Sequence, residues 1–425
     1  MTVLSREPAA DLVRVQKRVV GVLAGAQIVS GMGISVGFAV SSLVVYELSG
    51  STGLSGLAAT AVVLGAALLA LPTARTTAGG GRRAGLSFAY GCAFTGSVLA
   101  VAAINLGLWP LLLAALVLVG GGTAGNLSAR YAATDLAPPG HAARHLSWVV
   151  WAATIGAVAG PNLAQPASLL GTRLGLDPSA GPFAVAGMTF GLAALILNIG
   201  LRPDPLLLAR SVRTFSAGSS APAVRATAKA AWAALKVVPA SRRGLLAIAV
   251  SHTAMVSIMS MTPVHLTQGH ADLVVIGIVI SLHVAGMYML APVIGWLADR
   301  AGKAPVLVIG MLLLLAAAVI AGTAGHHVGL ITTGLILLGI GWSCGLIAGS
   351  AMLSEALALE LRPSVQGFSD LVMNTCGAAG ALLAGAVMGI TSFQVLAGLV
   401  AVMVVATALN LVRPLSSGPP ADLAA

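Results

Sequence analysis

The chain has 425 residues, of which 58% are hydrophobic and only 8% are charged. A soluble domain carries about 25% charged residues, so this composition excludes a soluble protein and indicates one that lies in a membrane. The net charge of +10 does not indicate nucleic-acid binding, because the basic residues follow a pattern of membrane topology.

Long apolar runs repeat along the chain and are separated by short polar segments. A helix needs about 20 apolar residues to cross the hydrocarbon core. We therefore predict an all-α membrane protein with twelve transmembrane helices, at 19–46, 54–74, 85–106, 108–132, 146–170, 182–201, 244–267, 273–298, 305–325, 328–353, 366–390 and 392–412. The first run is of spanning length and lacks a clear small-residue cleavage site, so we expect it to remain as a span.

The basic residues lie on one side of this arrangement. Of the 22 Lys and Arg residues, all but Arg173 fall before the first span, in alternate loops on the same side, or after the last span. Cytoplasmic loops carry the excess of basic residues in membrane proteins. We therefore predict that both termini are cytoplasmic.

A polar stretch from Arg202 to Arg243 divides the twelve spans into two sets of six. We predict an N-terminal six-helix bundle at 1–201, a cytoplasmic linker at 202–243 and a C-terminal six-helix bundle at 244–425. Within the stretch, Ser216–Pro222 is typical of a linker. The basic segment Ala223–Val238 is typical of a helix lying on the anionic inner surface, or of a solvated connector helix.

A loop motif follows the eighth span. The segment from Gly295 to Lys303 resembles the loop that joins the second and third helices of each half in the major facilitator superfamily. Asp299 and Arg300 are spaced to tie helix ends together, and Gly302 permits a tight turn. The corresponding first-half segment has Ala78 where the acid belongs, which predicts a weakened latch there.

Span five contains a glycine-proline pattern, Gly156, Gly160 and Pro161, that also resembles a motif of the superfamily, often associated with antiporters. A closely packed, bendable helix is the simpler interpretation, and it is favoured over an exchange role. The superfamily resemblance implies two six-helix bundles that expose a midplane substrate site alternately to each side. The chain lacks GxxxxGK[ST] and HExxH motifs, so we expect neither an enzyme nor a prosthetic group.

Two pairs of soft or borderline metal ligands lie inside spans seven and eight. Met255 and Met259 are four residues apart, as are His283 and Met287, so each pair shares one helix face. The spans run in opposite directions, and the pairs lie at similar depths. If both faces point inward, the four donors can form two layers between these helices. Met259 and His283 would lie in one layer, and Met255 and Met287 about one helical turn deeper. Thioethers favour Cu(I), imidazole also suits copper, and histidine within a membrane is by default functional.

Together, MxxxM in span seven and HxxxM in span eight closely resemble the CcoA-like copper importers of bacterial cytoplasmic membranes. The resemblance implies copper uptake by alternating access, with the four residues contacting the transported ion. A copper chaperone is then a candidate partner, and the chain is expected to act as a monomer. Members of that family also use a cysteine pair four residues apart. Here the cysteines, which all lie within spans, form no such pair: Cys92, Cys344 and Cys376.

The sequence also allows other copper contacts and other functions. His252 and His265 are additional candidate copper contacts. The alternative is that their side chains only form hydrogen bonds with helices or are solvated. A riboflavin carrier, or a carrier of another organic solute or drug, is the main alternative on the same scaffold, and a non-transporting copper sensor is a further one. A flavin would require aromatic stacking and amide hydrogen bonds. The residues that could supply them are Trp148, Trp151, Asn162, Gln165, Trp342 and Asn374.

Overall fold

The computed structural model describes residues 7–217 and 227–413, and within these ranges the chain is helical and contains no β-strand. The predicted all-α fold is confirmed. The first half contains α1 (Glu7–Ser49), α2 (Thr52–Ser55), α3 (Leu57–Asn105), α4 (Trp109–Ala132), α5 (Ala142–Asn162), α6 (Ala164–Arg173), a short 3₁₀ turn (Pro178–Ala180) and α7 (Gly181–Gly200). Next come α8 (Pro205–Ala217) and α9 (Ala228–Val237). The second half contains α10 (Pro239–Gln268), α11 (Leu273–Tyr288), α12 (Ala291–Ala301), α13 (Lys303–Thr323), α14 (Val328–Glu355), α15 (Arg362–Ile390) and α16 (Phe393–Val412).

The membrane spans agree in number with the twelve that hydropathy predicts. In the described ranges, ten helical segments are long and apolar enough to span, and α5 with α6, which meet at a bend of 60°, make one more. One of the ten is α3, whose 49 residues include two spans. A straight helix of that length would measure about 73 Å, against about 30 Å of hydrocarbon. The chain turns back at Gly81, whose φ of 84° glycine adopts without strain.

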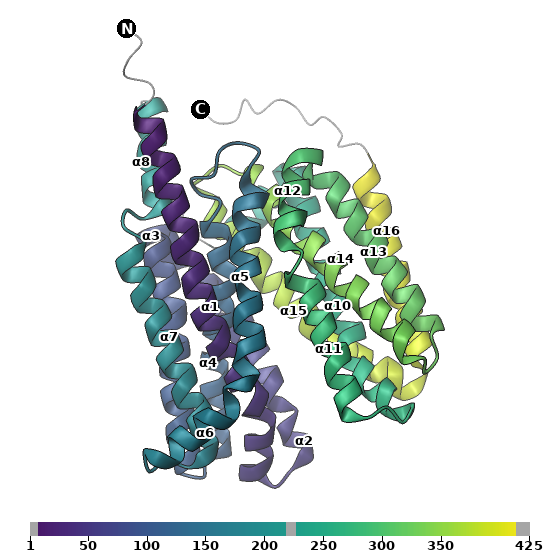
Figure 1. The fold of residues 1–425 in the computed structure, drawn as a ribbon. Coiled ribbons are helices and arrows are strands. Elements are labelled where there is room, and N and C mark those ends of the chain that lie inside the picture. Colours follow the sequence, from purple (N-terminus) through teal and green to yellow (C-terminus); the bar gives the residue numbers. More distant parts are fainter. Residues whose placement is uncertain (1–6, 218–226, 414–425) are drawn as a thin grey trace.

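The helices form two bundles, α1–α7 and α10–α16, that stand side by side in Figure 1. The start of α1, α8 and the end of α16 lie at the same end of the molecule. We call this end the basic end, because the predicted orientation places the basic loops there, and the opposite end the far end. The charge pattern predicts that the basic end faces the cytoplasm.

Small residues let the helices approach closely within each bundle. A Cβ on Gly65 of α3 would collide with the backbone of Val117 in α4. A Cβ on Gly120 of α4 would in turn lie 2.6 Å from the nitrogen of Ala66. Membrane helices gain most of their association energy from such close van der Waals contact. The high glycine content therefore has a packing role.

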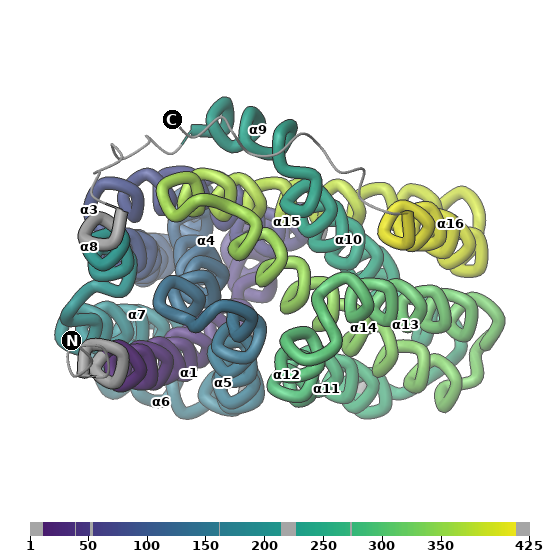
Figure 2. Tube along the Cα trace, turned by 90° about the horizontal axis from the view of Figure 1, so that it is seen from above, coloured from purple at the N-terminus to yellow at the C-terminus, as the bar shows by residue number. Residues whose placement is uncertain are grey.

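In its described residues, the segment between the bundles contains two helices and the start of a third. Of the predicted linker Ser216–Pro222, the first two residues end α8 and the others lie outside the described residues. The predicted surface helix includes α9, which Figure 2 shows on the rim of the molecule. Its buried face, with Ala231 and Leu235, packs on α15, and Trp232 meets Phe368 edge-on with ring centroids 6.4 Å apart. This helix is thus docked on the second bundle.

Candidate functional site

Met255 and Met259 lie one turn apart in α10. Met255 is buried, and Met259 packs partly buried against the same apolar cluster. The adjoining turn of α10 lies on α14, where a Cβ on Gly345 would collide with the side chain of Ser251. Met255 follows Ser251 by four residues and therefore lies on the same helix face. Met255 thus lies where α10 meets α14.

His283 of α11 is fully buried, and its imidazole has a defined orientation. Its Nδ1 lies 2.7 Å from the carbonyl oxygen of Leu335 in α14. Because a carbonyl only accepts hydrogen bonds, this contact places the ring proton on Nδ1 and leaves a lone pair on Nε2. Nε2 is buried without a hydrogen-bond partner among the described residues. An imidazole nitrogen in this state is available to a metal ion.

Met287, one turn beyond His283, is also buried, and its backbone nitrogen would lie 2.8 Å from a Cβ on Gly339 of α14. Three of the four predicted donors, Met255, His283 and Met287, therefore lie where their helices meet α14. Between the two helices, Trp342 of α14 donates from Nε1 to Nδ1 of His252 at 3.1 Å. The Trp342 ring also meets the ring of Tyr288 edge-on, with centroids 5.7 Å apart. The convergence of the four donors on one ion stays a prediction.

The two additional histidines have structural partners. Because the indole of Trp342 can only donate, Nδ1 of His252 accepts and a neutral His252 carries its proton on Nε2. Nδ1 of His252 is therefore committed to Trp342. His265 lies at the far end of α10, where its Nε2 is 2.7 Å from the carbonyl oxygen of Gly325. Its ring stacks on Phe393 with centroids 4.4 Å apart. Copper contact by either histidine stays a prediction.

Asp299 joins the two halves at the basic end. Its carboxylate accepts hydrogen bonds from the backbone nitrogens of Arg144 at 2.8 Å and Ala143 at 3.2 Å. These amides belong to the first turn of α5, where helix N–H groups lack partners and the helix dipole favours an anion. Lys303 adds a contact to Asp299 at 3.4 Å. This is the geometry that a latch requires, and its part in gating stays a prediction.

The rest of the loop motif supports this contact. A Cβ on Gly295 would collide with the side chain of Ser147 and lie 2.7 Å from the carbonyl oxygen of Ala143, so glycine allows α12 to reach α5. Gly302 turns the chain into α13 with a φ of 97°. Arg300 was expected to help tie helix ends, but its guanidinium lies over Trp296 of its own helix, 5.3 Å from the ring centroid.

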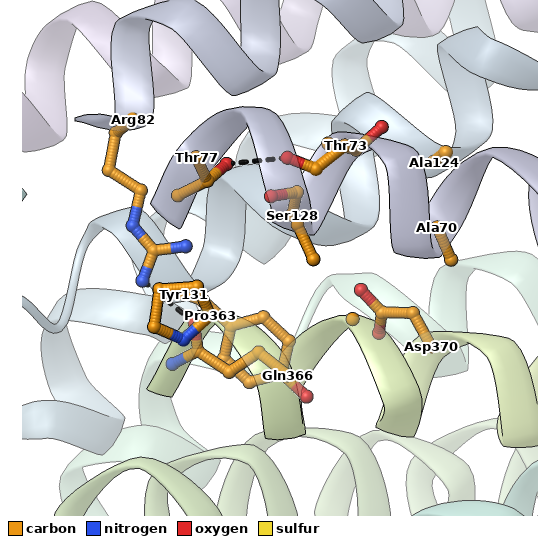
Figure 3. Close-up of a pocket in the computed structure, with 12 residues that line it drawn as sticks. Ala70, Thr73, Thr77, Arg82, Ala124, Ser128, Tyr131, Pro363, Gln366 and Asp370 are labelled. Atoms are coloured by element: carbon orange, nitrogen blue, oxygen red, sulfur yellow. Dashed lines mark hydrogen bonds between the residues drawn. The ribbon is translucent and has the colours of Figure 1, made fainter. Parts of the chain in front are cut away.

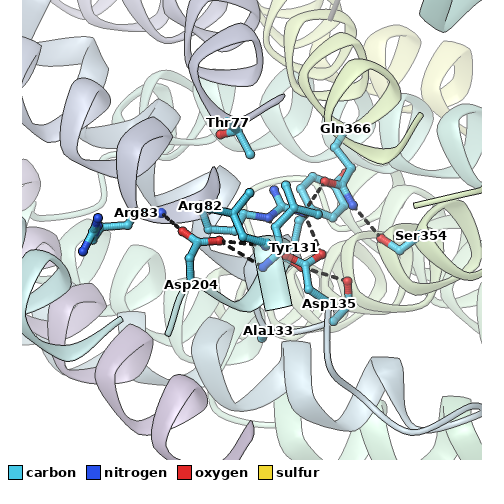
Figure 4. A network of polar contacts seen from close by, with 12 residues as sticks. Thr77, Arg82, Arg83, Tyr131, Ala133, Asp135, Asp204, Ser354 and Gln366 are labelled. Carbon is cyan, nitrogen blue, oxygen red and sulfur yellow. Dashed lines mark hydrogen bonds and ion pairs between the residues drawn. The ribbon is translucent and has the colours of Figure 1, made fainter. Parts of the chain in front are cut away.

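The first half contains a polar network that the sequence did not reveal (Figure 4). Arg82 is fully buried and donates from Nε and Nη2 to both carboxylate oxygens of Asp135, at 2.7 and 3.0 Å. Nη2 also donates to Oε1 of Gln366 in α15 at 2.7 Å, and Gln366 donates to Ser354 at 3.1 Å. The first half thus contacts the second through an arginine, although Ala78 replaces the acid of the loop motif.

A second buried arginine crosses between the halves nearby. Nη2 of Arg130, at the end of α4, lies 2.6 Å from the carboxylate of Asp370 in α15. Arg130 also donates from Nε to Ser350 of α14 at 3.1 Å. Figure 3 shows the space beside Asp370, Thr77 and Arg82, where a void of about 10 Å³ remains. Such a volume is about the smallest that holds one water molecule. The halves are therefore closed against each other at the basic end.

The glycines of α5 lie where this helix meets α1. A Cβ on Gly156 would lie 2.8 Å from the backbone of Gly31, and a Cβ on Gly160 would collide with the side chain of Ser35. The helix bends by 60° beyond Gly160, as the position of Pro161 in the sequence suggested. These glycines therefore support close packing, while an exchange role stays a prediction.

The sequence points to one of the two buried ion pairs, that of Arg130 with Asp370, but only through its acidic member. Asp370 is an acid inside a span, and such a residue requires a partner. Arg130 has the matching depth at the basic end, but the sequence alone shows it only as one of the basic residues that mark the cytoplasmic side. No sequence signal separated Arg82 from the neighbouring Arg83.

The comparisons agree with this architecture. The Major Facilitator Superfamily family model matches residues 244–424. The MFS-type transporter YdeG of Bacillus subtilis strain 168, an uncharacterised protein, is 34% identical over 385 residues, which cover 89% of this chain and 88% of that protein. The riboflavin transporter RfnT of Brucella anthropi is 30% identical over 280 residues, 64% of each chain. The crystal structure of the human organic anion transporter MFSD10 has a TM-score of 0.72 at 15% identity, covering 93% of this chain and 99% of that chain. With two six-helix bundles, this loop motif and these relatives, the chain belongs to the major facilitator superfamily of membrane transporters and is not an enzyme.

Proposed function

We propose that this transporter imports copper as Cu(I) across the bacterial cytoplasmic membrane, through a site to which Met255, Met259, His283 and Met287 contribute. The observation that carries the proposal is the buried Nε2 of His283, which has no hydrogen-bond partner among the described residues. Leaving a buried polar group unpaired costs about 1–3 kcal/mol. A ligand that accepts the lone pair of Nε2 would offset that cost.

The contact to Leu335 also supports a metal ligand. Metal-binding histidines commonly donate their second ring N–H to a carboxylate or a backbone carbonyl, which fixes the tautomer and the ring direction. His283 has this arrangement, with Nδ1 2.7 Å from the carbonyl oxygen. The ring therefore needs little reorganisation to bind an ion through Nε2.

The donor set selects the kind of ion. Thioethers and a neutral imidazole are soft or borderline ligands, which favour Cu(I), whereas Mg²⁺ and Ca²⁺ prefer oxygen ligands. Buried Met255 and Met287 offer sulfur within apolar surroundings. Neutral ligands also hold the ion less tightly than thiolates would, as transport requires.

The closed basic end fits one stage of an alternating-access cycle. In this conformation a site near the midplane would receive its ion from the far end, and opening the basic end would release it to the cytoplasm. We further propose that the transporter is a monomer with cytoplasmic termini. A copper chaperone would take the ion at the basic end.

A second candidate function is the transport of riboflavin or a similar aromatic solute. Two observations favour it: the 30% identity to a riboflavin transporter and the contact of Trp342 with Tyr288 and His252. Aromatic rings and an imidazole could stack on and bond to a flat ring system. Both candidates would use the same half of the molecule.

Copper accumulation in cells with and without the protein, measured by mass spectrometry, tests the proposal. We expect uptake to fall strongly in Met259→Leu and His283→Ala at unchanged protein levels, because a leucine keeps the volume but not the thioether. Met255→Leu and Met287→Leu should behave similarly or more mildly. The matched control is Met289→Leu, which makes the same exchange at the exposed residue that follows α11.

Purified protein separates binding from transport. Titration with Cu(I) should show tighter binding than titration with Zn²⁺, and Met259→Leu should narrow that difference, because the thioether rather than the imidazole favours Cu(I) over Zn²⁺. Riboflavin uptake is measured in the same cells. Parent-like copper uptake by Met259→Leu, His283→Ala and their double mutant would overturn the copper site. If the same variants lost riboflavin uptake instead, the second candidate would take its place.

A further inference from the structure

A large groove opens on the first bundle, away from the predicted copper site. It has a volume of about 1020 Å³ and lies between α1, α5, α8 and the loop that follows α4. Figure 2 shows α1 and α5 beside each other at the basic end. The transport path between the two bundles does not account for it, because its lining residues all belong to the first bundle and α8.

The groove is apolar along most of its length. Along α1 it is lined from Lys17 through Val20 and Ala24 to Ile28. At about 1.5 Å per residue, Ile28 lies roughly 16 Å beyond Lys17, which is about half of the ~30 Å hydrocarbon core. The apolar part therefore has the length of one leaflet. An acyl chain has the matching shape and chemistry.

The end of the groove nearest the basic loops is cationic. Lys17 and Arg144 line it with exposed side chains, and His141 lies beside them. The acid that also lines this end, Asp135, is buried and already paired with Arg82 at 2.7 Å. The groove thus presents a positive end towards the basic end of the molecule and an apolar remainder. Basic pockets between helices on the cytoplasmic side suit anionic headgroups.

We propose that this groove binds an anionic phospholipid, with its phosphate at Lys17 and Arg144 and an acyl chain along α1. Arginine and lysine form charge-assisted hydrogen bonds to phosphate oxygens. A zwitterionic headgroup would bring its own ammonium beside these two cations. The anionic class is therefore favoured over the zwitterionic one.

The rim of the groove is suited to a lipid contact. Trp148 is 44% exposed and meets Trp151 edge-on with ring centroids 5.9 Å apart. Tryptophan is enriched at the interface between headgroups and acyl chains. Gly21 leaves the groove open, because a Cβ there would meet no atom within 4 Å. An exposed apolar rim of this kind gains stability from contact with lipid.

The proposed headgroup lies next to the latch. The backbone nitrogen of Arg144 donates to Asp299 of the other half at 2.8 Å, while its side chain lines the groove. A bound phosphate would therefore hold the residue whose amide closes the basic end. Anionic lipid should favour the closed basic end for this reason.

Native mass spectrometry of the purified protein in detergent tests the proposal, with added phosphatidylglycerol or phosphatidylethanolamine of equal acyl length. The parent should retain phosphatidylglycerol preferentially. Gly21→Phe should fill the groove and lose most of this binding. Gly25→Phe is the matched control, since Gly25 also faces open space on α1 but does not line the groove.

The charge contribution has its own pair of variants. Lys17→Gln combined with Arg144→Gln should weaken phosphatidylglycerol binding by about tenfold or more, since each basic residue attracts anionic lipid. The control is Arg18→Gln, an exposed α1 residue outside the groove. Equal retention of phosphatidylethanolamine by the parent, or parent-like phosphatidylglycerol binding by Gly21→Phe, would overturn the proposal. The readout does not involve copper, so it is independent of the proposed function.

Discussion

Replacing Asp299 tests whether its carboxylate holds the basic end closed. The carboxylate accepts from two amides of the first turn of α5 in the other half. Replacing a capping side chain by alanine costs about 0.5–2 kcal/mol. Because these contacts join the two halves, Asp299→Ala should destabilise the closed conformation specifically. A loss of about 1–2 kcal/mol shifts the equilibrium towards the open basic end by roughly 5–30-fold.

Hydrogen–deuterium exchange followed by mass spectrometry measures this shift directly. Peptides from the start of α5 should exchange faster in Asp299→Ala by a similar factor. Asp299→Asn keeps one oxygen acceptor but loses the charge, so its effect should be smaller. Asp272→Ala is the control, because Asp272 precedes α11 but makes no capping hydrogen bond from its side chain.

Parent-like exchange at the start of α5 in Asp299→Ala would refute the latch. Copper uptake and Cu(I) affinity of the same variant provide a second test of the latch. Asp299 contacts Ala143, Arg144 and Lys303, none of which is a predicted copper ligand. We therefore expect Asp299→Ala to lower uptake while leaving the Cu(I) affinity of the purified protein near that of the parent.

Two further predictions concern the buried pair and the topology. Asp370→Asn leaves Arg130 buried without its ion-pair partner, a change that costs about 3–5 kcal/mol, so the thermal unfolding midpoint in detergent should fall clearly. Adding Arg130→Gln should recover part of the loss, and a fall equal to the sum of the two single variants would contradict the pairing. A reporter enzyme fused after Arg413 should read as cytoplasmic, and one inserted after Arg173 as external. An external signal after Arg413 would reverse the predicted orientation.

The spans and the number of helices could be predicted from the sequence, because the thickness of the bilayer sets the length of an apolar run. The turn at Gly302 was predicted because it depends only on local backbone chemistry. The turn at Gly81 likewise falls between two predicted spans, 54–74 and 85–106, and its φ of 84° is one that glycine adopts without strain. The loop motif likewise identified Asp299 as a candidate contact, but not the amides that it caps.

The polar contacts between the halves could not be predicted, because they join residues far apart in the chain. Arg130 and Asp370 are 240 positions apart, and Arg82 and Gln366 are 284 apart. Their sequence surroundings show only a charge near the end of a span. Each arginine finds its partner because the two bundles close at the basic end, and burial then makes an unpaired charge too costly.

The candidate copper site also depends partly on local sequence and partly on contacts between helices. The sequence alone identified His283 and Met287 as candidate ligands on one helix face. Their residue types and their four-residue spacing sufficed, because helical periodicity is a local property. Which nitrogen of His283 keeps a lone pair depended on the carbonyl of Leu335, which reaches it from another helix. The groove beside Lys17 had no sequence signal at all, because α1, α5 and α8 form it only when packed together. The sequence by itself determined the membrane spans, their charge pattern and the candidate ligands, whereas helix packing decided which polar groups are paired, which are left open and where a lipid could bind.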